Sequence, residues 1–182
     1  MVTAIGVIEL SSIAKGIELC DNMIKAATVK VLDSLPMCPG KYVIIIAGDI
    51  ASVESSVAVA SDKAKPYVLD SVLIPNIHEQ VMHAVNGTTP QDHLEALGIV
   101  ETFSVASCIR AADTAVKAAF VNLIEVRLSR GMGGKSYVTL TGTVGDVTAA
   151  VEAGAACARQ EGLLVADTVI ASPHEELERF IL

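Results

Sequence analysis

The chain has 182 residues, of which 52% are apolar and 19% charged, so it is long enough for one large or two small domains with substantial cores. Aromatic residues make up only 3% and the formal net charge is −8, which argues against a nucleic-acid partner because such proteins carry a basic surface. The N-terminus lacks a basic segment followed by an apolar one, and no apolar run reaches about 18 residues, so we expect a cytoplasmic protein with no membrane partner.

The first elements are a short strand and an amphipathic helix. Residues 4–9 form an apolar run typical of a buried strand, and Ser11 or Ser12 is placed to cap the helix that follows. The apolar residues of this helix recur at helical spacing and make one apolar face. They are Ile13, Ile17, Cys20 and Ile24.

The next segments alternate between strand and helix patterns. Residues 29–35 alternate apolar and polar side chains, as in a strand with one wet face, and Pro36 is expected to end it. The remaining elements are a strand at 42–47, a helix after Asp49, a strand at 72–74 and a short helix at 78–85.

The second half of the chain repeats the first in order. Residues 4–9 return as 96–101, Lys25 and its two following alanines return as Lys117 and its two alanines, and the Gly-Lys pair at 40–41 returns at 134–135. A period near ninety residues is too long for a solenoid repeat, so each copy is a small domain. We therefore expect an α+β protein of two domains, 1–86 and 96–182, joined by a polar linker at 87–95. Each domain is predicted to have a mixed sheet with helices on one side.

This ordered set of motifs resembles the bacterial microcompartment (BMC) shell domain. The resemblance rests on the strand at 4–9, the Asp-x-x-x-Lys-Ala-Ala helix end at 21–27, the Gly-Lys pairs and the Pro-His-Glu of 173–175. Two copies in one chain look like the tandem, trimer-forming class. The segments 36–41 and 75–78 look like the tandem shell protein of propanediol-utilising microcompartments that carries an iron-sulfur cluster.

The resemblance implies a structural role rather than an enzyme. It implies a homotrimer that forms a pseudohexamer, tiles with other shell proteins into a hexagonal sheet and lies in the shell of a cytoplasmic bacterial microcompartment. It places Lys25 and Lys117 at the outer edge, where neighbouring hexagons meet. Single-domain relatives often have an arginine within the Pro-x-Pro-His segment, whereas this chain has Asn76 and Ser172, so edge contacts are expected to differ from theirs.

Cys38 carries the sharpest chemical signal. Pro36 and Pro39 flank it and Gly40 permits a tight turn, so its sulfur is expected on a rigid loop outside regular structure. A threefold axis would gather three such thiols, and the resemblance implies one 4Fe-4S cluster per trimer with Cys38 of each subunit as the protein ligand. The pore would be lined by Met37, Cys38, Pro39, Gly40, Met132, Gly133 and Gly134, with Met132 standing where Cys38 stands in the first copy.

Other features favour structural roles. The segment 129–136 is close to a phosphate-binding loop but precedes a strand pattern rather than a helix, which excludes that function. The other cysteines, Cys20, Cys108 and Cys157, lie on apolar helix faces and are expected to be small buried residues.

The resemblance implies a shell protein whose cluster transfers electrons across the shell or passes on cluster components, with an encapsulated redox enzyme as a partner. Two alternatives remain open at this point. One is a shell protein with a metabolite pore and no cluster, and the other is a trimeric effector-binding module.

Overall fold

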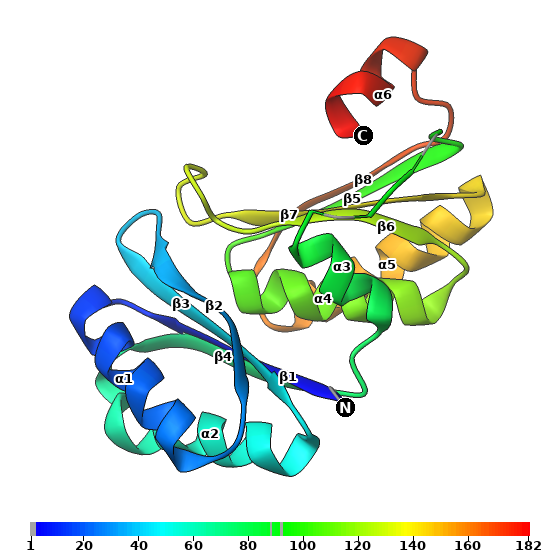
Figure 1. Ribbon diagram of the computed structural model, residues 1–182. Helices are drawn as coiled ribbons and strands as arrows, with labels where there is room; N and C mark the ends of the chain where they lie inside the picture. Colours follow the sequence, from blue (N-terminus) through cyan, green and yellow to red (C-terminus); the bar gives the residue numbers. More distant parts are fainter. Residues whose placement is uncertain (1–2, 88, 92) are drawn as a thin grey trace. The chain divides into compact units, whose positions relative to one another are not determined.

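The computed structural model describes residues 3–87, 89–91 and 93–182 and divides the chain into two compact units (Figure 1). Unit 1 comprises Met1–Ile77 and Ser129–Gly134, and unit 2 comprises His78–Leu128 and Lys135–Leu182. Each unit contains one four-stranded sheet with its own helices. The two-domain α+β class expected from the sequence is confirmed.

Unit 1 has a sheet in the order β2-β3-β1-β4, in which neighbouring strands run antiparallel. Ser12 caps the first helix, as expected, by accepting a hydrogen bond from the Lys15 amide, and Asp49 caps the second. The elements are β1 (Ala4–Leu10), α1 (Ile13–Ala26), β2 (Lys30–Met37), β3 (Lys41–Gly48), α2 (Ile50–Lys63), a 3-10 turn (Lys65–Tyr67) and β4 (Val68–Pro75).

The core of unit 1 lies between one face of the sheet and the helices α1 and α2 (Figure 1). Ile8, Ile44 and Ile46 point from the strands toward Leu19 of α1 and Val53 of α2. Two glycines let the layers approach closely. A Cβ atom on Gly6 would lie 2.6 Å from Val57, and one on Gly16 would lie 2.2 Å from the ring of Tyr42.

Unit 2 repeats this arrangement with the strand order β6-β7-β5-β8, again with antiparallel neighbours. The helices α4 and α5 cover one face of its sheet, and α3 packs against α4 and β6. The elements are α3 (Glu79–Val85), β5 (Ala96–Thr102), α4 (Val105–Ala118), β6 (Asn122–Arg127), β7 (Ser136–Gly142), α5 (Val144–Gln160), β8 (Leu164–Ile170) and α6 (Glu175–Ile181).

The two units match in detail, as expected for a duplicated domain. Ala4 pairs with Gly48 in unit 1 as Ala96 pairs with Gly142 in unit 2, and both edge strands carry an irregularity at the same place in the repeat. The Gly-Lys lysines also match, because Lys41 pairs with Glu9 at 3.2 Å and Lys135 with Glu101 at 3.1 Å. These ion pairs give the repeated motif a structural role.

The structure differs from the expected strand pattern in two details. Pro36 lies inside β2 rather than ending it. This is tolerated because β2 is an edge strand: one of its sides has no neighbouring strand, so a missing backbone N–H on that side leaves no hydrogen bond unmade. The strand pairs of the two described sheets are all antiparallel, where the sequence suggested a mixed sheet.

The expected domain division also differs from the observed units. The helix α3, expected at the end of the first domain, groups with unit 2, and Ser129–Gly134 groups with unit 1. In the expected linker, Thr88 and Asp92 lie outside the described residues.

Candidate functional site

Cys38 lies on the turn between β2 and β3, at the tip of a hairpin (Figure 1). The Gly40 amide donates to the Met37 carbonyl at 2.9 Å and closes the turn. Gly40 has φ +96°, a conformation that favours glycine, and a Cβ atom there would meet nothing within 4 Å. Cys38 and Pro39 are exposed, whereas Met37 is buried. The turn therefore presents the thiol to solvent and keeps the neighbouring methionine in the core.

The segment Ser129–Gly134 lies beside this turn in unit 1. The Cys38 amide donates to the Ser129 carbonyl at 3.2 Å, and the Ser129 hydroxyl donates to the Cys38 carbonyl at 3.1 Å. The next residue, Arg130, donates from its guanidinium to the Asp33 carboxylate of β2 at 3.0 Å. Because both backbone groups of Cys38 are fixed, its position is set by the second loop as well as by its own prolines.

The structure thus brings together the two loops that the sequence analysis places at the pore. Gly134 is buried against Pro39, and it has φ +93°, while Met132 is half-buried and Gly133 exposed. The loop partners Ser129, Arg130 and Asp33 were not identified from the sequence. Their only signal is that Ser129 and Arg130 directly precede the glycine-rich run.

Cys38 is the exposed thiol among the four free cysteines. Cys108 is buried in α4, as expected, but Cys20 in α1 and Cys157 in α5 are only half-buried. Among the described residues of one chain, no group of three or more His, Cys, Asp or Glu side chains is placed to hold a metal ion. The donor type still fits an iron-sulfur centre, because an exposed, unpaired thiol on a fixed loop is accessible to iron from outside its own chain.

The two candidate edge lysines occupy equivalent places in their units. Lys25 lies in the last turn of α1 and pairs with Asp21 at 2.5 Å, and Lys117 lies in the last turn of α4 and pairs with Asp113 at 2.5 Å. The Lys25 side chain is 71% exposed and that of Lys117 39%. Both lysines are therefore available to contact another molecule.

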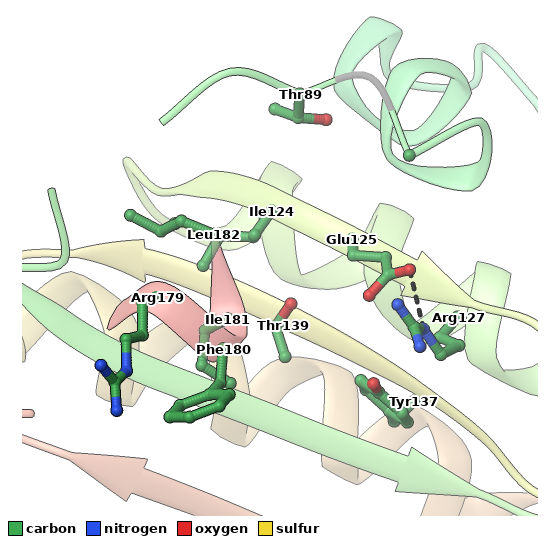
Figure 2. Close-up of a pocket in the computed structure, with 11 residues that line it drawn as sticks. Thr89, Ile124, Glu125, Arg127, Tyr137, Thr139, Arg179, Phe180, Ile181 and Leu182 are labelled. Atoms are coloured by element: carbon green, nitrogen blue, oxygen red, sulfur yellow. Dashed lines mark hydrogen bonds and ion pairs between the residues drawn. The ribbon is translucent and has the colours of Figure 1, made fainter. Parts of the chain in front are cut away.

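A hollow that the sequence did not indicate lies in unit 2, under the C-terminal helix α6 (Figure 2). It has a volume of about 410 Å³. Glu125 accepts a hydrogen bond from Arg127 at 2.8 Å, and this bond and charge raise the pKa of the guanidinium above its ordinary value. The hollow is open. Its walls come from β6, β7, Gly87 and Thr89 after α3, and the last residues of the chain, including Arg179 and Phe180.

Comparison with known families decides the class of this protein. The family model of the BMC domain matches residues 4–77 and again residues 96–173. The chain belongs to the BMC domain family. The two matches fall on the two copies of the internal repeat, so the tandem BMC organisation expected from the sequence is confirmed.

Individual BMC proteins match over one copy or both. The chain is 45% identical to the bacterial microcompartment shell protein PduT of Citrobacter freundii over 179 residues, which cover 98% of this chain and 97% of PduT. It is 42% identical to the shell protein PduA of the same organism over 87 residues, which cover 48% of this chain and 91% of PduA. The crystal structure of a microcompartment protein from Desulfitobacterium hafniense is 50% identical, with a TM-score of 0.90, and the match covers 98% of this chain and 99% of that one.

These similarities identify a structural protein of the bacterial microcompartment shell, rather than an enzyme or an effector-binding module. Among the described residues, no helix is long and apolar enough to cross a membrane.

Proposed function

We propose that this BMC protein forms a homotrimer whose central pore holds one 4Fe-4S cluster, bound by Cys38 of each subunit. The observation that carries the proposal is the exposed thiol of Cys38 on a turn that the Ser129–Gly134 loop holds in place. The resemblance of the segments 36–41 and 75–78 to a cluster-carrying shell protein supports the same assignment.

One chain supplies one such thiol, so the cluster requires several copies. A threefold axis brings equivalent residues of three subunits to one place, and thiolates are the usual protein ligands of iron-sulfur clusters. Three Cys38 thiolates would bind three of the four irons and leave the fourth to a ligand that is not a protein side chain. When bound, the cluster supplies one-electron redox chemistry, which suits electron transfer across the shell to an encapsulated redox enzyme.

Iron and sulfide analysis of protein purified without oxygen tests this proposal. We expect about four irons and four sulfides per trimer, with the visible absorbance of an iron-sulfur protein. A protein that contains no iron after anaerobic reconstitution would contradict the cluster. The glycines at 131, 133 and 134 would then favour a pore for metabolites.

The trimer is a separate prediction. Two homologous domains per chain complete a pseudo-sixfold ring when three chains associate, so light scattering under reducing conditions is expected to give about three times the chain mass of 18.9 kDa. A stable monomer at micromolar concentration would contradict this assembly.

Replacing both Lys25 and Lys117 by alanine is expected to impair sheet formation and leave the trimer folded. Both side chains are exposed in the last helical turn, so their loss removes contacts at the rim and costs little stability. Electron microscopy of overproduced protein measures the sheets, and light scattering measures the trimer. Lys15→Ala, at the other end of α1, is the control and should form sheets normally. Unchanged sheets in the double variant would remove the edge assignment.

A further inference from the structure

The apolar face of α1 is exposed, whereas the equivalent face of α4 is buried. Ile13, Ile17 and Ile24 are 42%, 57% and 46% exposed. Their counterparts at the same positions of the repeat, Val105, Ile109 and Val116, are 0%, 0% and 8% exposed. The two helices start and end at equivalent residues, so the difference lies in what covers them and not in the helices themselves.

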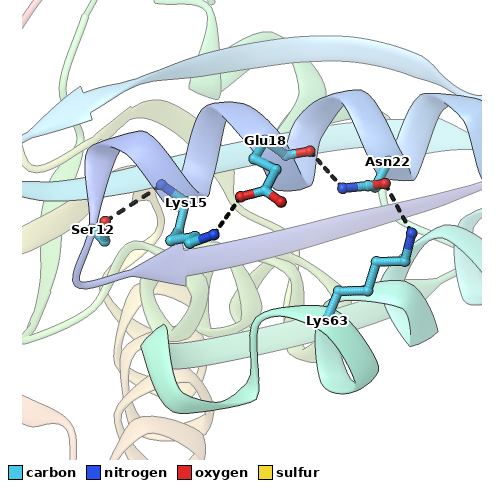
Figure 3. A network of polar contacts seen from close by, with 5 residues as sticks. All are labelled: Ser12, Lys15, Glu18, Asn22 and Lys63. Carbon is cyan, nitrogen blue, oxygen red and sulfur yellow. Dashed lines mark hydrogen bonds and ion pairs between the residues drawn. The ribbon is translucent and has the colours of Figure 1, made fainter.

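The contacts that α1 makes inside unit 1 leave this face open. Gly16, Leu19 and Met23 are its buried residues. On another side of the helix, Figure 3 shows a row of polar contacts in which Asn22 donates to the Glu18 carbonyl at 2.8 Å and Lys63 of α2 donates to Asn22 at 2.9 Å. At 100° per residue, the three isoleucines lie within about 40° of one another and nearly opposite this polar row. We name Ile13, Ile17 and Ile24 the isoleucine stripe.

A hydrogen bond in unit 2 shows which kind of segment packs beside α4, the counterpart of α1. The His78 amide, just before α3, donates to Asp113 of α4 at 2.8 Å, and the other oxygen of Asp113 pairs with Lys117. His78 also caps α3, because its ring Nδ1 accepts from the Gln80 amide at 3.3 Å. This contact joins the segment just before α3 to α4, and both lie in unit 2.

Both halves of the same contact occur a second time, and among the described residues neither half has the backbone hydrogen bond that its counterpart makes. Asp21 of α1 is the counterpart of Asp113. It pairs with Lys25 and accepts no other hydrogen bond from the described part of the chain. His174 is the counterpart of His78, and its ring likewise caps α6 by accepting from the Glu176 amide at 3.2 Å. Within the described residues the His174 amide has no acceptor.

We propose that the His174 segment of one copy docks on α1 of a second copy, where the His174 amide donates to Asp21 and the second copy covers the isoleucine stripe. The occupant is another copy of this chain because the chain itself contains the donor, the acceptor and a completed example of the same contact. The donor and the acceptor belong to two different surface patches, the segment before α6 and the helix α1. The association is therefore head to tail, as a closed ring of identical subunits requires.

This inference rests on the proposed homotrimer and names the surfaces that form it. The first test is Ile17→Asp, which places a charge in the isoleucine stripe at an exposed position. Because Ile17 is exposed in the single chain, we expect the variant to remain folded. Association would bury its charge without a partner, which is costly, so we expect light scattering to show loss of the trimer. Ile50→Asp is the matched control, because Ile50 is 38% exposed and its counterpart Val144 is 44% exposed, so neither copy of that position is covered.

The second test removes the His174 amide proton, and its control accounts for the ring that is lost with it. His174 has φ −68°, which proline adopts without strain, so His174→Pro deletes the donor and leaves the backbone path unchanged. His174→Ala is its control, since alanine keeps the amide but, like proline, lacks the ring that caps α6. A lost hydrogen bond to a charged group corresponds to roughly a tenfold or greater weakening of association. We expect this shift in the dissociation concentration for the proline variant only.

The two variants also complement each other if association is head to tail. Ile17→Asp retains an intact His174 segment, and His174→Pro retains an intact stripe, so a mixture should form heterodimers joined through one intact interface. A wild-type trimer with an equally stable Ile17→Asp trimer, or equal effects of His174→Pro and His174→Ala, would overturn the docking surfaces while leaving the trimer standing. A monomeric wild type would overturn the proposed trimer itself.

Discussion

Cys38→Ser is expected to remove all bound iron and the visible absorbance, while the protein remains a trimer. The side chain is exposed at the tip of a hairpin and contributes nothing to either core, so the substitution costs the fold little. Serine keeps the size of the side chain but is a far poorer ligand for iron, and each subunit would lose its one ligand at the axis. The measurements are iron and sulfide content after anaerobic reconstitution, and light scattering for the assembly.

The control for this experiment is Cys157→Ser. Cys157 lies on α5 and is half-buried, so the variant tests whether any accessible thiol accounts for the iron. It should retain the full iron content. If Cys38→Ser holds as much iron as the wild type, Cys38 is not the ligand, and a shell protein with an open pore becomes the better description.

Much of the fold could be predicted because the sequence repeats itself. When a pattern occurs twice, as in the strand at 4–9 and its copy at 96–101, two different sequences support the same prediction. Both segments are central strands of their sheets. Pro36 was misjudged because the usual rule concerns strands with neighbours on both sides. Whether a strand lies at an edge depends on the strand order, which local sequence does not contain.

The helix faces show another limit of sequence patterns. The apolar period identified Ile13, Ile17 and Ile24, yet the sheet is contacted by Gly16, Leu19 and Met23. Periodicity indicates which face avoids water, but it does not say whether the cover comes from the same chain or from another copy. The pairing of Cys38 with Ser129 was equally hidden, because these residues are 91 apart in the chain. The Cys38 backbone bonds to the carbonyl and the hydroxyl of Ser129, and a single serine carries no sequence signal for such a contact.

Gly16→Ala is expected to lower the free energy of unfolding by about 1–3 kcal/mol, the range for overfilling a packed core. A Cβ atom at Gly16 would lie 2.2 Å from Cδ1 of Tyr42 and 2.7 Å from its Cβ, so the ring cannot avoid it by rotating about χ1 alone. The ring is only 6% exposed, and its hydroxyl lies 3.0 Å from that of Ser34, so moving it also disturbs this hydrogen bond. Denaturant unfolding of the variant and the wild type measures the difference.

The second unit supplies a compensating change and α5 supplies a control. At the positions of Gly16 and Tyr42, unit 2 has Cys108 and Ser136, so the equivalent positions carry a larger helix residue and a smaller strand residue. Combining Gly16→Cys with Tyr42→Ser should therefore cost less than the sum of the two single changes, since the thiol occupies space that the ring has left. Gly145→Ala is the control, because a Cβ atom there meets nothing within 4 Å and alanine favours the helix by up to about 1 kcal/mol. Equal stability of Gly16→Ala and Gly145→Ala would show that the contact between α1 and Tyr42 is loose in solution. Additive losses of stability in the double variant would show that the smaller residue at position 42 does not compensate for the larger residue at position 16.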